Sequence, residues 1–272
     1  MKREKPVGDD IRVAAECLRK SRKIAVFSGA GVSAESGIGT FRDDDGLWSR
    51  FPPEEFAHWQ GLMQVAMETP HRAAEFLVAF LRPVVEAQPN AGHRAIAELE
   101  SHRVVTIITQ NVDGLHELAG SKTVYAIHGN LYNTVYLDGT PRGPITRAEI
   151  AKIVGALDPL CQEDATFAEL MAAVEPIMGA NDRGPYLPKL VLFGDQLAEP
   201  DWTDAQAAAR ACDCMLVVGA SGAVYPAATL PTIAREGGAT IIGVDPRQVD
   251  ADLWLKGAAG TILPELISAA FD

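Results

Sequence analysis

The sequence predicts an α/β protein with a doubly wound, mostly parallel sheet and a smaller, mainly helical second domain. Two observations predict the sheet: short apolar runs that resemble buried strands, and helix-length segments that separate most of them. Strands covered on both faces are continuous hydrophobic runs, and parallel neighbours are joined by helical crossovers. A third observation predicts the second domain, because two long stretches interrupt this alternation.

The elements of the sheet follow in order along the chain. A helix is expected first, because Ile11, Ala14, Ala15 and Leu18 recur at helical spacing. The apolar run KIAVFS then predicts a buried strand at residues 23–28. Further strands are predicted at residues 104–109, 124–127, 190–193, 215–218, 240–244 and 260–263. Helices are expected in the intervening segments, among them residues 90–100 and 205–211.

Two inserts are expected to form the second domain. Residues 44–90 contain a helix-like run from 71 to 86, and residues 138–188 carry apolar side chains at helical spacing. The turn-forming sequence DGTP at residues 138–141 marks one boundary. The larger domain is therefore expected to comprise residues 1–43, 91–137 and 189–272, and the small helical domain residues 44–90 and 138–188.

The composition excludes several classes of protein. Hydrophobic residues make up 47% of the 272 positions, which is enough for a substantial core. A formal net charge of -12 argues against nucleic acid or an anionic membrane surface as the main partner. No apolar run reaches the roughly 18 residues of a membrane-spanning helix. Four cysteines without a pairing pattern, and no signal peptide, predict a protein of the reducing cytoplasm.

The first candidate site is the sequence GAGVSA at residues 29–34, directly after the first predicted strand. It fits the G-x-G-x-x-G/A pattern of Rossmann-like domains, in which glycines let backbone amides approach a pyrophosphate. A tight turn without a ligand is the alternative interpretation. The acidic residue usually found about 20 residues later is missing, because TFRDDDGLW at residues 40–48 does not resemble a strand end. A dinucleotide would therefore be held differently than in a dehydrogenase.

Two further polar motifs follow predicted strands. Gln110, Asn111 and Asp113 come after the strand at residues 104–109, and His128 follows the strand at residues 124–127. Ligands of doubly wound sheets bind beyond the carboxyl ends of the strands, so these side chains are well placed for a sugar and an amide. Histidine is suited to accept a proton near neutral pH. By itself, however, His128 fits a structural role equally well.

Taken together, the motifs resemble those of the sirtuins, the Sir2 family of NAD-dependent protein deacylases. The matching segments are residues 29–42 (GAGVSAESGIGTFR), 110–113 (QNVD), 128–129 (HG), 193–195 (FGD) and 219–228 (GASGAVYPAA). They occur in the family's order and spacing and cover nearly the whole chain outside residues 138–188. The sequence DGLW at residues 45–48 and PNAGHRAIAE at residues 89–98 look most like the bacterial and mitochondrial deacylase branch.

The resemblance implies an enzyme that cleaves NAD to nicotinamide and transfers the acyl group of a modified lysine, giving O-acyl-ADP-ribose. Its implied partners are NAD and an acyl-lysine protein or peptide, and the net charge of -12 already argues against nucleic acid or membrane. The implied catalytic residues are His128 as general base, Asn111 and Asp113. The implied cofactor contacts are Gly29, Ala30, Gly31, Glu35, Phe41, Arg42, Gln110, Asn111, Asp113, Gly219, Ala220, Ser221, Val244 and Asp245. The implied substrate contacts are Leu77, Phe80, Val191, Phe193 and Gly194, the last three pairing with the peptide as an added strand.

The chain departs from the family pattern mildly at Gly39-Thr40 and around Asp245, and more clearly in two other places. Sirtuins carry a four-cysteine zinc ribbon between the catalytic histidine and the Phe-Gly motif, but this interval holds only Cys161 and no histidine. A structural zinc site needs four such ligands, so no metal is expected. The Tyr-x-x-Arg pair that binds acidic acyl groups is replaced by Leu77 and Phe80, which predicts a preference for neutral acyl groups. Arg72 or Arg82 as a substitute partner for a carboxylate is the alternative.

Three other activities fit the same motifs. The ribosyl group could pass to water, as in an NAD glycohydrolase, or to a protein side chain, as in an ADP-ribosyltransferase. A non-catalytic NAD sensor is the third alternative, although a protein that only binds NAD has little need of the base His128.

Overall fold

The computed structural model describes residues 7–40 and 46–272. The chain divides into two compact units. The first unit comprises Met1–Gly37, Gln88–Ile127 and Leu197–Asp272, and the second comprises Ile38–Ala87 and His128–Gln196. The domain boundaries expected from the sequence stay a prediction. Within the described residues, no helix is both long enough and apolar enough to cross a membrane.

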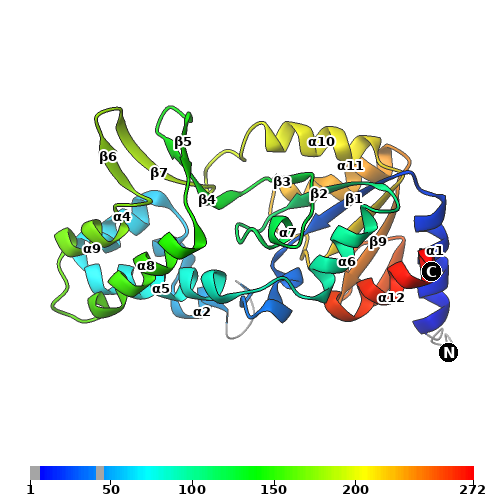
Figure 1. Cartoon of the computed structure of the whole chain (residues 1–272), viewed down its shortest axis with the longest axis horizontal. Coiled ribbons are helices and arrows are strands. Elements are labelled where there is room, and N and C mark those ends of the chain that lie inside the picture. The colour runs from blue at the N-terminus through cyan, green and yellow to red at the C-terminus, as the bar shows by residue number, and fades with distance from the viewer. Residues whose placement is uncertain (1–6, 41–45) are drawn as a thin grey trace. The chain divides into compact units, whose positions relative to one another are not determined.

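The first unit is built on a six-stranded sheet in which every neighbouring pair is parallel (Figure 1). The strands are β1 (Lys23–Ser28), β2 (Val104–Thr109), β3 (Val124–Ala126), β8 (Cys214–Val218), β9 (Thr240–Asp245) and β10 (Leu253–Lys256). Their order is β10-β9-β8-β1-β2-β3. β2 and β3 therefore lie on one side of β1, whereas β8, β9 and β10 lie on the other. The order of strand addition thus reverses between β1 and β8, and doubly wound sheets bind ligands at such a switch point. The predicted fold class is confirmed.

Helices cover both faces of this sheet (Figure 1). They are α1 (Val7–Lys20), α6 (Ala91–Leu99), α7 (Leu115–Leu118), α10 (Asp201–Ala211), α11 (Leu230–Glu236) and α12 (Ala259–Phe271). Alternate residues of β1 enter different cores: Ile24 and Val26 pack with α1, α6 and α12, whereas Ala25 and Phe27 pack with α10 and α11. This alternation follows from the two-residue period of a strand and explains why β1 is apolar throughout.

Two strand predictions are wrong. Residues 260–263 belong to α12, because their apolar side chains continue a helical repeat in which Ile262, Leu263, Leu266 and Ile267 are all buried. Residues 190–193 do not form a strand either, since the strand β7 (Gly184–Leu190) ends where the predicted one begins. The remaining predicted strands of the sheet are confirmed.

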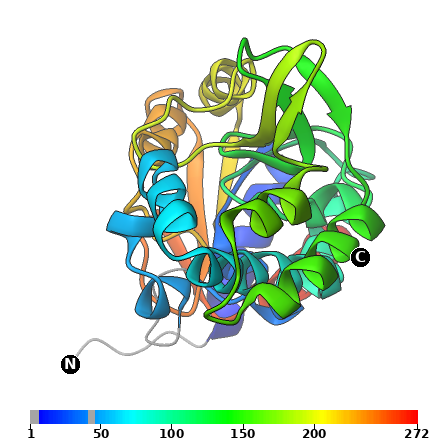
Figure 2. The ribbon, with the colours of Figure 1, turned by 90° about the vertical axis from the view of Figure 1, so that its left-hand side faces the viewer.

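The second unit combines helices with an antiparallel sheet that the sequence did not suggest. Its helices are α2 (Leu47–Arg50), α3 (Pro53–Phe56), α4 (Trp59–Glu68), α5 (Pro70–Glu86), α8 (Arg147–Leu157) and α9 (Phe167–Val174). The strands β4 (Gly129–Tyr136), β5 (Pro141–Pro144), β6 (Gly179–Asn181) and β7 are ordered β5-β4-β7-β6. Figure 2 shows the two hairpins side by side, in green and yellow-green. The short strands GAN and PRGP have low intrinsic strand propensity, so pairing with β4 and β7 decides their conformation.

Local contacts support the insert that contains α8 and α9. Both helices begin with a capping box, formed by Thr146 with Glu149 and by Thr166 with Glu169. Each cap satisfies backbone N–H groups that the first turn of a helix leaves without intrahelical partners. On the sheet, the Arg142 guanidinium lies 3.8 Å from the centroid of an aromatic ring, that of Tyr186. These contacts and an apolar core stabilise the insert.

Candidate functional site

Two glycine loops meet at the switch point of the sheet. The Gly31 N–H donates to the Gly219 carbonyl at 3.0 Å, and the Gly29 N–H donates to the Val218 carbonyl at 3.1 Å. A Cβ atom on Gly29 or on Gly31 would lie only 2.7 Å from backbone atoms of Gly219. Gly219 itself has φ +57°, a left-handed conformation that favours glycine. The loops after β1 and β8 therefore pack backbone against backbone, which leaves no room for side chains there.

The segment after β1 forms two short 3-10 turns, Ala30–Val32 and Ala34–Ser36. The Glu35 carboxylate, an expected cofactor contact, accepts a hydrogen bond from the Gly260 N–H at 2.6 Å, in the first turn of α12. Glu35 thus caps a helix and ties the glycine loop to it.

Polar side chains after β2 form hydrogen bonds with the glycine loop after β1. The Asn111 amide donates to the Gly29 carbonyl and to the Ser33 hydroxyl, both at 3.1 Å. The Ser33 hydroxyl donates to the Asp113 carboxylate at 2.7 Å, and the Leu115 N–H donates to the same carboxylate at 2.9 Å. Asp113 is only 4% exposed, so these donors satisfy a buried charge. Asn111 and Asp113 are therefore brought together with the glycine motif.

Two buried histidines complete this network, and sequence reasoning missed both. His116 Nε2 lies 2.9 Å from the Ser28 hydroxyl, and the rings of His93 and His116 are 4.9 Å apart. Burial lowers the pKa of His93 to about 4, helped by the charge of Arg94. Burial also lowers the pKa of His116 to about 3, with His93 as the second cause. Both rings are neutral at pH 7 and act as uncharged hydrogen-bonding groups. The sequence offered one signal for His93: Asn90, three residues earlier, is a typical helix N-cap and forms a capping box with it.

The remaining cofactor candidates of the first unit lie at the ends of neighbouring strands. The Gln110 N–H follows β2 and donates to the Ser28 carbonyl at 3.0 Å. Val244 is buried in β9, and the Asp245 carboxylate at its end accepts from the Arg247 N–H at 2.8 Å. Because β8 and β9 are parallel neighbours, Asp245 lies at the same sheet edge as the loop of Gly219, Ala220 and Ser221. Ala220 is buried, whereas Ser221 is exposed.

Two expected cofactor residues, Phe41 and Arg42, lie outside the described residues.

In the second unit, a glycine determines how His128 is presented. Gly129 has φ +82°, and a Cβ atom there would lie 1.9 Å from the Lys189 carbonyl oxygen. The His128 carbonyl accepts from the Val191 N–H at 2.9 Å, which pairs the start of β4 with the residue after β7. The His128 side chain is half-buried. Only glycine permits this approach, so Gly129 sets the backbone that carries His128.

The segment around Phe193 is hydrogen-bonded within its own unit. The Phe193 N–H donates to the Ala57 carbonyl at 2.8 Å, and the Val191 N–H is bound by the His128 carbonyl. These groups cannot simultaneously pair with a peptide strand. The Phe193 ring is 41% exposed, and Gly194 adopts φ +92°. The segment is therefore a shaped turn with an exposed ring, and a peptide would need its other backbone groups.

The two expected acyl-pocket residues lie on α5. Leu77 and Phe80 are half-buried against an aromatic cluster, in which the Phe76 and Phe80 rings are stacked with centroids 6.2 Å apart. The neighbouring arginines are already paired: Arg72 with Glu55 at 2.8 Å, and Arg82 with Asp158. In the structure, both guanidinium groups therefore already face a carboxylate of this chain.

The second unit does not fit the zinc site that the resemblance implies. Its cysteine, Cys161, lies after α8, and the thiol faces the Leu157 carbonyl at 3.6 Å. Among the residues that the structure describes, no group of three or more His, Cys, Asp or Glu side chains is placed to hold a metal ion.

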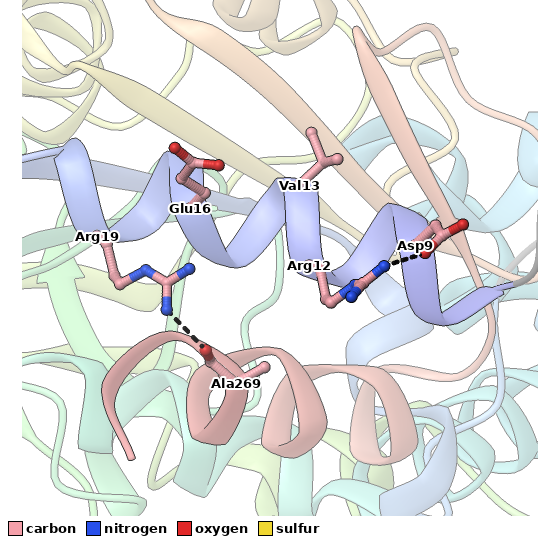
Figure 3. Close-up of a pocket in the computed structure, with 6 residues that line it drawn as sticks. All are labelled: Asp9, Arg12, Val13, Glu16, Arg19 and Ala269. Atoms are coloured by element: carbon pink, nitrogen blue, oxygen red, sulfur yellow. Dashed lines mark hydrogen bonds and ion pairs between the residues drawn. The ribbon is translucent and has the colours of Figure 1, made fainter.

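A surface groove of about 650 Å³ lies between α1 and α12, away from these motifs (Figure 3). Its lining residues are Asp9, Arg12, Val13, Glu16, Arg19 and Ala269. Arg12 pairs with Asp9, and the Arg19 guanidinium donates to the Ala269 carbonyl at 3.3 Å. Because the guanidinium groups of Arg12 and Arg19 are both engaged by groups that line the groove, we assign it no ligand.

A doubly wound sheet with paired glycine loops at its switch point, backed by an amide and a carboxylate, defines a nucleotide-binding α/β protein. Its family follows from comparison with known proteins. The chain belongs to the Sir2 family, whose family model matches residues 29–226. The resemblance seen in the motifs is thereby confirmed.

Relatives and solved structures match most of the chain. It is 38% identical over 268 residues to NAD-dependent protein deacylase 2 of Archaeoglobus fulgidus, covering 95% of each chain. It is 39% identical over 251 residues to the NAD-dependent protein deacylase of Mycolicibacterium paratuberculosis, covering 90% of this chain and 96% of the relative. A crystal structure of a Sir2 homologue in complex with NAD matches with a TM-score of 0.74 at 32% identity, covering 94% of this chain and 92% of the homologue.

Proposed function

We propose that this protein is an NAD-dependent protein-lysine deacylase, which transfers the acyl group of a modified lysine to the ADP-ribosyl part of NAD and releases nicotinamide, free lysine and O-acyl-ADP-ribose. The carrying observation is the run of three neighbouring strands: β1 leads into the glycine loop, β2 into Gln110, Asn111 and Asp113, and β3 into His128. The names of the relatives, which are NAD-dependent protein deacylases at 37–39% identity, support this function. NAD and an acyl-lysine protein or peptide are the partners, with no role for nucleic acid or membrane.

Each residue has a definite task in this proposal. NAD supplies the ribosyl group that accepts the acyl group. His128 takes a proton from a ribose hydroxyl as general base. Asn111 and Asp113 keep the glycine loop in place and thereby order the pocket for the ribose and the carboxamide. Gln110 binds the ribose.

The phosphates and the adenosine are held by the loops at the sheet edge. Backbone amides of Gly29, Ala30, Gly31 and of the Gly219 loop, with Ala220 and Ser221, approach the phosphates because these loops lack bulky side chains. Val244 lies beside the adenosine, and the Asp245 carboxylate accepts from its ribose hydroxyls. Phe41 and Arg42 are assigned to the nicotinamide side and the phosphate loop.

The substrate is proposed to be a neutral acyl-lysine. Leu77 and Phe80 offer apolar surface, and the nearby Arg72 is engaged by a carboxylate. Acetyl or longer aliphatic groups should therefore be removed, and succinyl groups should not. Val191, Phe193 and Gly194 dock the peptide.

Two further properties belong to this proposal. We propose that the second unit contains no structural zinc, since the interval between His128 and Phe193 offers Cys161 as its one cysteine and no histidine. The four thiols of the chain are unpaired, which supports a place in the reducing cytoplasm.

The deciding experiment measures nicotinamide release from NAD with and without an acetyl-lysine peptide, followed by mass spectrometry of the peptide. Peptide-dependent release with loss of the acetyl mass is the expected result. His128→Ala should abolish it while NAD binding persists, and His102→Ala, which alters an exposed histidine, is the matched control. Release without peptide would identify a glycohydrolase, a peptide that gains ADP-ribose would identify a transferase, and binding without release would identify a sensor.

A further inference from the structure

We propose that His58 and Trp59 are positioning residues that clamp residues 191–195, named here the docking segment, in the conformation that receives the substrate peptide. This inference rests on the proposed function, because the docking segment is assigned to peptide binding there. Neither residue belongs to a motif of the sequence analysis. Both come from the junction between α3 and α4, more than 130 positions away from the segment they hold.

The first part of the clamp binds both backbone groups of Phe193. Its N–H donates to the Ala57 carbonyl at 2.8 Å, and its carbonyl lies 2.6 Å from His58 Nδ1. A carbonyl oxygen only accepts, so Nδ1 of His58 carries the proton of this hydrogen bond. The His58 and Phe193 rings also meet edge to face, with centroids 5.9 Å apart. The backbone of Phe193 is thus held by one short segment, whereas its ring contacts both His58 and Trp48.

The second part of the clamp fixes the turn that follows Phe193. The indole N–H of Trp59 donates to the Asp195 carboxylate at 3.0 Å, and the same carboxylate oxygen accepts from the Leu192 N–H at 3.0 Å. The Asp195 N–H donates back to the Leu192 carbonyl at 3.1 Å. Asp195 therefore closes a tight turn, and Trp59 attaches this turn to α4.

The docking segment depends on these contacts because, beyond the hydrogen bond from the Val191 N–H to the His128 carbonyl, no strand pairing of the described residues holds it. β7 ends at Leu190, and Gly194 has φ +92°, a conformation without strand pairing. A loop that must order itself on binding loses affinity through the entropy of ordering. The clamp orders the docking segment before the peptide binds, so this entropic cost is not incurred on binding. The exposed Phe193 ring stays available to a ligand.

The test is a kinetic comparison of His58→Ala, His58→Asn and Trp59→Phe with the wild type. Asn places an amide N–H near the position of Nδ1, and Phe keeps an aromatic ring but removes the indole N–H. His102→Ala and Trp202→Phe are matched controls on the first unit. We expect the KM for acetyl-lysine peptide to rise about tenfold in His58→Ala and about threefold in Trp59→Phe, as for one lost hydrogen bond. The kcat and the KM for NAD should stay within about twofold of the wild type.

Rescue and hydrogen exchange distinguish the loss of the clamp from a general loss of stability. His58→Asn should recover most of the peptide KM, and amide exchange at residues 191–195 should accelerate in His58→Ala but not in the controls. An unchanged peptide KM in His58→Ala would overturn the proposal, as would a parallel rise in the KM for NAD. A failure of His58→Asn to restore the KM would overturn the assignment to a hydrogen bond. If the wild type releases no nicotinamide with peptide, the proposed function fails, and unchanged exchange rates would separately reject the clamp.

Discussion

The two buried histidines should make the stability of this protein fall steeply in mild acid. The folded protein lowers the pKa of His93 to about 4 and that of His116 to about 3, mainly because burial disfavours their charged forms. An unfolded histidine titrates near pH 6.5. The unfolded state therefore binds protons first as the pH falls, so the stabilisation is fully present above about pH 6.5 and is lost below it.

The magnitude follows from the same values. Each pKa unit corresponds to about 1.4 kcal/mol, so each histidine should cost about 2 kcal/mol of unfolding free energy between pH 7.5 and pH 5.0, or about 4 kcal/mol together. This window lies above the range in which carboxylates titrate. Because the native stability of a domain is about 5–15 kcal/mol, such a loss is large.

Urea unfolding at several pH values between 7.5 and 5.0 measures this effect. His116→Gln keeps a hydrogen-bonding group beside Ser28 but cannot titrate, so it should remove about half of the pH dependence. His102→Gln changes an exposed histidine and should leave the dependence intact. A wild-type unfolding free energy that differs by less than about 1 kcal/mol between pH 7.5 and 5.0 would refute the reasoning.

Further predictions concern the glycine loops, the buried carboxylate and the thiols. Gly219→Ala should lower the unfolding free energy by about 2–4 kcal/mol, because φ +57° and a backbone atom 2.4 Å from the new Cβ leave no room; a thermal midpoint equal to that of the wild type would contradict this. Asp113→Ala leaves two buried donors without this acceptor, so NAD affinity measured by calorimetry should fall at least about tenfold, and unaltered affinity would count against the loop-holding role. A hydrogen bond from the Cys214 thiol lowers the pKa of Cys17 to about 6, whereas partial burial raises that of Cys161. Iodoacetamide at pH 7 should therefore label Cys17 first, as peptide mass spectrometry would detect, and preferential labelling of Cys161 would show the assignment to be wrong.

The sequence predicted the central sheet well because its strands are short, buried and bounded by clear turns. β1, β2, β8 and β9 lie where the apolar runs placed them. The errors came from apolar runs too short to distinguish the two-residue period of a strand from the 3.6-residue period of a helix. Residues 260–263 alone fit a strand, and only the buried positions that follow show a helix. β10 was missed because LWLK is short and half-buried.

The second unit was harder to predict because its strands depend on their partners. The segments PRGP and GAN contain glycine and proline, which single-chain propensity assigns to turns. PRGP pairs with β4, and GAN pairs with β7. The backbone N–H and C=O groups of β4 and β7 need hydrogen-bond partners regardless of the side chains that the partner strand carries. The helices α8 and α9 could be predicted because their apolar spacing is local.

The sequence by itself determined where most of the strands and motifs lie along the chain, and thereby the membership in the Sir2 family. It could do so because glycine, amide and histidine positions after buried strands are local features. Only the tertiary structure decided which groups meet. The contact of Gly31 with Gly219, the capping of α12 by Glu35 and the hold of His58 on Phe193 all join distant segments. The same holds for the low pKa of His116, since burial depends on what the rest of the chain packs around a residue. Local patterns can place a side chain after a strand, but the partner that satisfies it is chosen by packing.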